Sequence, residues 1–371
     1  MTSEEKIQKA IRLEKYNSKD EIPVFPMIIT YAGVPAGITQ KELFTGNQAW
    51  RDAIDKSFQE IGAYPDMVMP VGAADTVFIE SMRARLPGRE LGDNELFQFV
   101  EQQVMKEEDY QVVMDKGYQF WKMSYLCSIQ EPPIVPDEAG IGQIVGRLME
   151  VGKNFVINEQ FWKEKDIPVC FQTGCAPAFD EFSMARGMED FFFDLYDDPD
   201  MVKAACAAAT PAIVGQALQS LKPGDRVAMF AMRSSASFIS PEMFEEFAFP
   251  YMKQMVESFY EHGVTTVIHC DGNWLPMLPY FRELPKGSCI IELDGTTDIE
   301  ESVKILRGYQ CIRGDLPASL LAFGTEEEVK AYCDKLIGLA MDGGFIIGTG
   351  CEVPLNAKIE NMRVFMNCLK Q

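Results

Sequence analysis

Four short apolar segments in the second half of the chain decide the fold: TTVIHC (265–270), CIIELD (289–294), CIRGD (311–315) and GFIIGTG (344–350). Such segments, apolar on both faces and rich in β-branched residues, are typical of parallel strands that helices cover on both sides. The amphipathic stretches 251–263 and 298–308 end in Gly263 and Gly308, which are favourable helix C-caps. This alternation predicts βα units and a parallel sheet.

The same alternation continues toward the N-terminus and brings the number of predicted strands to eight. The additional segments are IPVFPMI (22–28), DMVMPV (66–71), IPVCFQT (167–173) and RVAMFAM (226–232). Eight strands that alternate with helices predict an α/β fold, a (β/α)8 TIM barrel, as a single domain over residues 1–371. Residues 72–166 interrupt the pattern, and we interpret them as an insertion after the second strand, partly a hairpin, over one barrel mouth.

The composition excludes several classes of partner. The chain has 34 basic and 56 acidic residues, and its net charge of −22 would repel nucleic acid and anionic membranes. No apolar run approaches the ~18 residues of a membrane span, and the charged N-terminus has no export signal. Ten cysteines without framework spacing are typical of a reducing compartment. We therefore expect a cytoplasmic protein with no nucleic-acid and no membrane partner.

The candidate functional residues lie at the carboxyl ends of the strands, where TIM barrels carry their active sites. His269, one of only two histidines, lies late in the 265–270 strand, and Asp271 follows on the same face of the extended chain. Glu292 and Asp294 end the next strand, and Cys351 follows the last one. One His, one Cys and a carboxylate suit a zinc site with three protein ligands and an open position. The alternative is that His269 and Cys351 only pack in the core.

The motifs of the chain resemble the uroporphyrinogen decarboxylase superfamily. In the family's order they are ISPEMFEEFAFPYMKQM (239–255), VIHCDG (267–272), ELDGTTD (292–298), RGDLPASLL (313–321) and GGFIIGTGCEVP (343–354), followed by Asn361. The N-terminal IPVFPM and ARGMEDFFFDL (185–195) also fit. The resemblance therefore covers most of the chain and implies the same barrel.

Two chemistries occur in this superfamily. True uroporphyrinogen decarboxylases carry an arginine-rich loop after the first strand, whereas MIITYAGVPAGIT (27–39) contains no arginine. The chain is more similar to the zinc-dependent, corrinoid-linked methyltransferases, whose pattern has His-x-Cys-Gly late in the fifth strand and a Gly-Cys turn after the eighth. His269 and Cys351 match the first and last ligands of that pattern, while Asp271 stands where its middle Cys would be.

This resemblance implies Zn²⁺ held by His269, Cys351 and at least one carboxylate among Asp271, Glu292 and Asp294. Related cobalamin-independent methionine synthases place a glutamate ligand some two dozen residues after the His, where Glu292 lies in this chain. Asp294 competes with Glu292 for that role and is also the candidate catalytic residue. A carboxylate in place of a thiolate makes zinc a stronger Lewis acid, which suits a poor leaving group.

The implied reaction moves a methyl group from a small methoxylated substrate, such as an aromatic methyl ether, to a Co(I) corrinoid, as in O-demethylation. His262 lacks the DxHxxG context of a corrinoid ligand, so a separate corrinoid protein must supply the acceptor. Tyr31 is the candidate for binding the methyl donor, and we expect Asp315 and Asn361 to be turn and cap residues. Three alternatives stay open: methyl transfer from methylcorrinoid to a thiol or a pterin, uroporphyrinogen-type decarboxylation, and a metal-free, non-enzymatic binding barrel.

Overall fold

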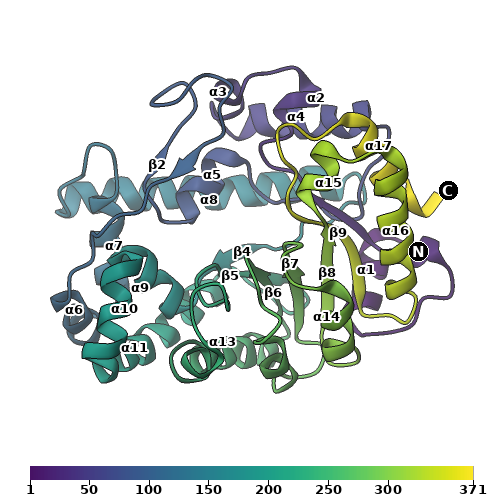
Figure 1. Cartoon of the computed structure of the whole chain (residues 1–371). Helices are drawn as coiled ribbons and strands as arrows, with labels where there is room; N and C mark the ends of the chain where they lie inside the picture. The colour runs from purple at the N-terminus through teal and green to yellow at the C-terminus, as the bar shows by residue number, and fades with distance from the viewer. Residues whose placement is uncertain (371) are drawn as a thin grey trace.

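The centre of the molecule is a parallel sheet. In the computed structural model, which describes residues 1–370, seven strands form this sheet in the order β1-β9-β8-β7-β6-β5-β4 (Figure 1). They are β1 (Val24–Met27), β4 (Thr173–Cys175), β5 (Arg226–Ala231), β6 (Thr265–Cys270), β7 (Cys289–Leu293), β8 (Cys311–Leu316) and β9 (Phe345–Glu352). The strands predicted from 265 to 350 are thus all present, and β6 has the predicted bounds.

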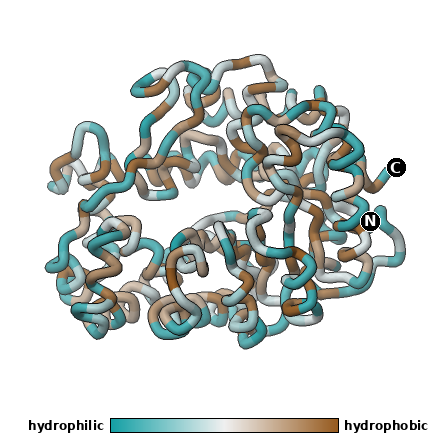
Figure 2. Tube along the Cα trace, in the orientation of Figure 1, coloured by the Kyte–Doolittle hydropathy of each residue, from teal (hydrophilic) through white to brown (hydrophobic). Residues whose placement is uncertain are grey.

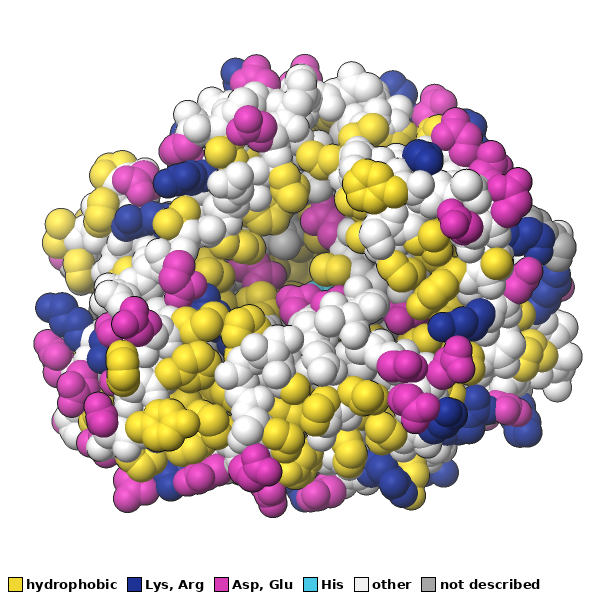
Figure 3. All heavy atoms as spheres, viewed as in Figure 1, with side chains coloured by type: hydrophobic (Ala, Val, Ile, Leu, Met, Phe, Trp, Pro, Cys, Tyr) yellow, Lys and Arg dark blue, Asp and Glu magenta, His cyan; other side chains and the backbone are white. Residues whose placement is uncertain are grey.

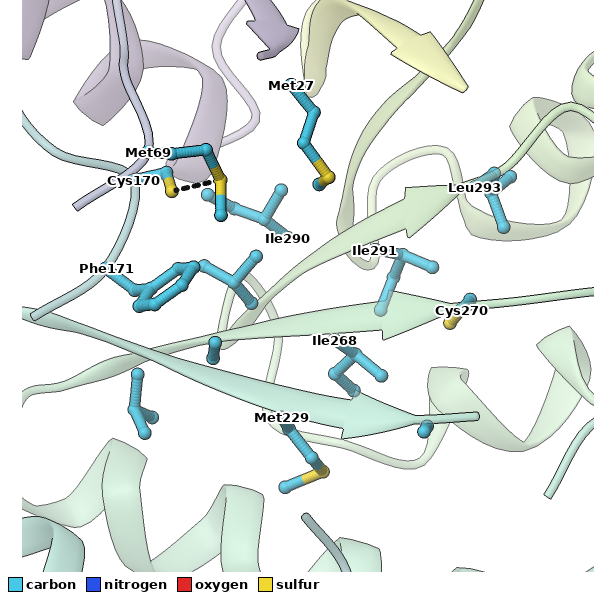
Figure 4. Packing of buried hydrophobic residues seen from close by; sticks show 14 of the residues in the cluster. Met27, Met69, Cys170, Phe171, Met229, Ile268, Cys270, Ile290, Ile291 and Leu293 are labelled. Atoms are coloured by element: carbon cyan, nitrogen blue, oxygen red, sulfur yellow. Dashed lines mark hydrogen bonds between the residues drawn. The ribbon is translucent and has the colours of Figure 1, made fainter. Parts of the chain in front are cut away.

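The segment around Val68 joins the two edges of this sheet. The Asp66 amide donates to the Val24 carbonyl at 2.9 Å, and the Cys170 amide donates to the Val68 carbonyl at 2.9 Å. Close by, the sulfur atoms of Met69 and Cys170 lie 3.7 Å apart (Figure 4). The predicted second strand is therefore reduced to an isolated parallel bridge, Val68 to Val169. With this connection the sheet fits a TIM-barrel-like α/β fold.

Helices surround the sheet. Those from the N-terminus to α8 are α1 (Ser3–Ile11), α2 (Gly33–Ala36), α3 (Gln40–Leu43), α4 (Asn47–Ile61), α5 (Ala73–Ile79), α6 (Glu108–Lys116), α7 (Tyr118–Ser128) and α8 (Glu138–Lys163). Those that follow are α9 (Ala178–Arg186), α10 (Met188–Asp197), α11 (Pro199–Leu218), α12 (Pro241–Met243), α13 (Phe249–Glu261), α14 (Ile299–Leu306), α15 (Ala318–Phe323), α16 (Glu326–Ala340) and α17 (Ile359–Met366). Gly263 and Gly308 have φ of 71° and 77°, as expected of helix C-caps.

The core lies between the strands and these helices. All five residues of β7 and all six of β8 are buried, and hydrophobic residues run through the central strands (Figure 2). Ile268, Ile290 and Met229 show the packing at close range (Figure 4). Burying an aliphatic side chain contributes roughly 1.5–3 kcal/mol. This core therefore holds the carboxyl ends of the strands in fixed positions.

Residues 72–166 contain α5 to α8 and one short antiparallel pair, β2 (Ala84–Arg85) with β3 (Gln98–Phe99). Helix α8 is the longest of its helices, with 26 residues, and Asp137 caps it by accepting the Gly140 amide at 2.9 Å. That this region is an insertion over the barrel mouth stays a prediction. Its importance for function lies in the side chains of α5 and α7 that line the cavity described below.

Helix α11 is the one helix among residues 1–370 that is long and apolar enough to cross a membrane. It packs against α6 and α13, and 44% of its apolar window is buried. Two further expectations concern polar residues. Asn361 donates to the carbonyls of Leu320, Leu321 and Gly324, which confirms a capping role at the end of α15. The prediction that Asp315 is a turn residue is wrong, because it lies inside β8 and accepts from the Tyr332 hydroxyl at 2.9 Å.

Candidate metal centre

The carboxyl ends of β6, β7 and β9 bring the predicted metal-binding side chains together. The register of the sheet sets His269 beside Glu292 on the neighbouring strand. On the other side of the imidazole ring, Nε2 lies 3.4 Å from Asp271 Oδ1 and 3.9 Å from Cys351 Sγ. One ligand atom from each of His269, Asp271 and Cys351 can be chosen so that all three lie within 4.8 Å of one another.

The chemistry of this group fits zinc. One imidazole nitrogen, one thiol sulfur and one carboxylate oxygen are ordinary zinc ligands, and three of them leave a fourth position for a substrate. The separations of 3.4 and 3.9 Å from Nε2 are close to what ligands at about 2.0–2.3 Å from a shared ion require. The thiol disfavours magnesium and calcium, which prefer oxygen ligands.

Glu292 lies behind His269 rather than in this group. Its Oε2 is 3.0 Å from His269 Nδ1, and its Oε1 is 3.8 Å from Nη1 of the fully buried Arg313. Burial raises the pKa of the Glu292 carboxyl, but Arg313 and His269 outweigh burial, so the pKa is lowered and the group is ionised. A carboxylate on Nδ1 holds the proton there and leaves Nε2 free to bind a metal.

The charges around His269 favour a cation. Burial lowers the pKa of the imidazole, but Asp271, Cys351 and Glu292 together raise it well above its usual value. For Asp271, burial raises the carboxyl pKa and His269 lowers it, with a lowered pKa as the result. The cluster therefore attracts positive charge, whether a proton on His269 or a metal ion between its donor atoms.

Asp294 and Tyr31 lie outside this group. The Asp294 carboxylate accepts the Gly272 amide at 2.7 Å and the Thr296 amide at 2.8 Å, so it ties together the loops after β6 and β7. Tyr31 is 1% exposed, and burial, with Glu360 of α17 nearby, raises the pKa of its hydroxyl to about 12. Its hydroxyl therefore lies toward α17.

A cavity of about 490 Å³ lies beside Phe230, a neighbour of His269, and the sequence did not predict its lining. Its walls include Phe78 and Glu80 from the region of α5, Tyr118 and Lys122 from α7, and Phe230 from β5. The Phe230 ring packs edge-on against the His269 ring, with centroids 6.2 Å apart. Figure 3 looks into a hollow with a histidine at its floor, surrounded by acidic and apolar side chains. The aromatic-rich stretch at 117–127 was the one signal in the sequence for this lining.

Comparisons with known proteins connect the chain to both branches of one family. The family model described as uroporphyrinogen decarboxylase (URO-D) matches residues 164–371. The methylcobamide:CoM methyltransferase MtbA of Methanosarcina mazei is 24% identical over 229 residues, which cover 61% of this chain and 63% of that protein. The uroporphyrinogen decarboxylase of Prochlorococcus marinus is 30% identical over 154 residues, which cover 41% of this chain and 43% of that protein. The chain thus matches less than two thirds of the length of these relatives.

The fold is also similar to a solved structure described as a methyltransferase from Methanosarcina mazei. The TM-score is 0.70, the sequence identity is 15%, and the match covers 100% of this chain and 98% of the other. At this identity the likeness shows a shared fold.

Proposed function

The chain belongs to the uroporphyrinogen decarboxylase family, and on this premise we propose that it is a zinc-dependent, corrinoid-linked methyltransferase. In this proposal it moves the methyl group of a small methoxylated substrate to the Co(I) corrinoid of a separate protein. The observation that carries the proposal is the convergence of His269, Asp271 and Cys351 donor atoms within 4.8 Å at the strand ends. These three residues would hold the ion, and Glu292 would orient His269. When bound, zinc supplies a Lewis acid beside the cavity.

The residues around the centre suit a methyl ether as donor. Asp271 contributes an oxygen where the methyltransferase pattern has a second sulfur. A carboxylate donates less electron density than a thiolate, so the zinc would be a stronger Lewis acid and would help a poor leaving group to depart. Phe78, Phe230 and Met232 give the adjoining cavity apolar walls, which can bind an aromatic ring and exclude water. The corrinoid is expected from a partner protein, because His262 lacks the DxHxxG context of a corrinoid ligand.

Decarboxylation of uroporphyrinogen is less well supported. Its substrate carries many carboxylates, and the segment 27–39 after β1 has no arginine to bind them. In the cavity itself, Lys122 is already paired with Glu181. A net charge of −22 adds to the repulsion of a polyanion.

A second candidate function is the transfer of a methyl group from methylcorrinoid to a thiol. It is favoured by the names of two relatives, the methylcobamide:CoM methyltransferase and a methylated-thiol–coenzyme M methyltransferase of Methanosarcina mazei. The same three ligands would serve this reaction, with the thiol at the open position.

One pair of assays separates these functions. The zinc-loaded protein is mixed with a corrinoid protein in the Co(I) state and a series of methoxylated aromatic compounds, and methylcorrinoid formation is followed by absorbance. In parallel, the methylcorrinoid protein is mixed with a series of thiols. We expect turnover in the first assay and its loss in His269→Ala. Turnover confined to the second assay would establish thiol methylation, and turnover in neither would refute methyl transfer.

A further inference from the structure

We infer that Glu80 is a further catalytic residue, an acid that gives its proton to the leaving oxygen of the methoxylated donor. Glu80 follows α5 directly, and its side chain lines the cavity beside the metal centre. Its Oε2 is buried and has no hydrogen-bond partner among residues 1–370. A buried carboxyl oxygen without a partner is costly, which suggests that a ligand completes its hydrogen bonding. The inference rests on the proposed function, because it assigns a role in that same reaction.

The neighbours of Glu80 favour its protonated form. Burial is the main cause that raises the pKa of Glu80 to about 7; the charge of His269 opposes this rise, and the charges of Asp271 and Glu181 add to it. The ammonium group of Lys122 does not offset this rise in the pKa of Glu80, because it is paired with Glu181. Tyr118 also faces Glu181. A carboxyl that titrates near neutral pH is well matched to general acid catalysis.

The other carboxylates near the centre already have partners. Glu181 binds Lys122, Glu292 binds His269, and Asp294 accepts two backbone amides. Asp271 belongs to the metal-binding group itself. Among the acidic residues at this end of the barrel, Glu80 therefore combines a free oxygen with a position on the cavity wall.

The step that Glu80 assists is balanced without an oxidant or a reductant. The bond between the methyl carbon and the ether oxygen breaks, and the carbon forms a bond with the electron pair of the Co(I) corrinoid on the partner protein. The electron pair of the broken bond stays on the oxygen, which takes the proton of Glu80. The product is the free alcohol or phenol, and solvent returns a proton to the Glu80 carboxylate. An unactivated phenolate is a poor leaving group, since a phenol has a pKa of about 10.

The test uses the leaving group as the readout. Glu80→Gln and the wild type are assayed with the corrinoid protein and two aryl methyl ethers of similar size, one unsubstituted and one with a nitro group that stabilises the phenolate. We expect Glu80→Gln to lose about 10²–10⁴-fold in rate with the unsubstituted donor and far less with the nitro donor. Glu150→Gln, whose side chain is 63% exposed on α8, serves as the matched control and should equal the wild type with both donors. Equal losses of Glu80→Gln with both donors, or none, would overturn the inference.

Two further measurements keep the test decisive. Glu80→Asp retains an acid at this place, so it should recover part of the loss with the unsubstituted donor even if Glu80→Gln folds poorly. Infrared difference spectra between the wild type and Glu80→Gln should contain the band of a protonated carboxyl that titrates near pH 7. Absence of this band would refute the acid role while leaving the methyltransferase proposal intact. A wild type that moves no methyl group from any ether would instead refute the proposed function, and the role of Glu80 with it.

Discussion

At the residue scale, the candidate centre has an inner group and a row of side chains behind it. His269, Asp271 and Cys351 face one another, while Glu292 and then Arg313 stand behind the imidazole. Arg313 is itself fixed by the Phe25 carbonyl at 3.1 Å and by Thr349 Oγ1 at 3.3 Å. This arrangement sets which ring nitrogen of His269 faces Asp271 and Cys351.

Glu292→Gln tests this row of side chains. The amide keeps the shape of the carboxylate but removes the charge that holds the proton on Nδ1. We expect zinc affinity to fall about 10–100-fold, as measured by competition with a chromogenic chelator. Glu283→Gln, on a side chain 54% exposed, should bind zinc like the wild type. Complete loss of zinc in Glu292→Gln would instead indicate that Glu292 is a direct ligand.

At the element scale, the loops after the strands determine whether the ligands can meet. The end of β9 passes very close to the loop after β7 at Gly350, just before Cys351. A Cβ placed at Gly350 would lie 2.3 Å from the Asp294 carbonyl oxygen, a backbone atom that cannot rotate away. The absence of a side chain at this position therefore allows the contact that positions Cys351.

Gly350→Ala should separate these two segments. We expect a loss of about 1–3 kcal/mol in the free energy of unfolding, from overpacking, together with weaker zinc binding. Urea denaturation and zinc titration measure the two effects. Gly338→Ala is the matched control, because nothing lies within 4 Å of its Cβ on the exposed side of α16. That change should stabilise the helix by about 0.5–1 kcal/mol. Unaltered stability and zinc binding in Gly350→Ala would contradict this account of the contact.

At the scale of the whole molecule, the sequence predicted the regular part of the sheet well. The 265–270 strand has its predicted bounds because β-branched residues buried on both faces leave little alternative. The 66–71 segment forms a single β-bridge, at Val68, and Pro65 before it and Pro70 within it lack the amide hydrogens that a longer strand would need.

The metal-binding group could be predicted in part because two of its residues lie on one regular, extended segment. His269 and Asp271 alternate along one extended segment, and this local regularity places them together. Glu292 and Asp294 do not share a partner in this way, because Glu292 faces His269 Nδ1 whereas the Asp294 carboxylate accepts the backbone amides of Gly272 and Thr296. Glu80 could not be predicted at all, since it is 189 positions from His269 in sequence and only the packing of α5 on the barrel brings the two near each other.

The central claim is that His269, Asp271 and Cys351 bind zinc, and the metal content of the purified protein tests it most directly. Protein prepared without chelators is analysed by plasma mass spectrometry alongside His269→Ala and Cys351→Ala, with circular dichroism to verify folding. We predict about one zinc per chain in the wild type and its loss in both folded variants. A wild type without zinc, or zinc that survives both substitutions, would contradict the account.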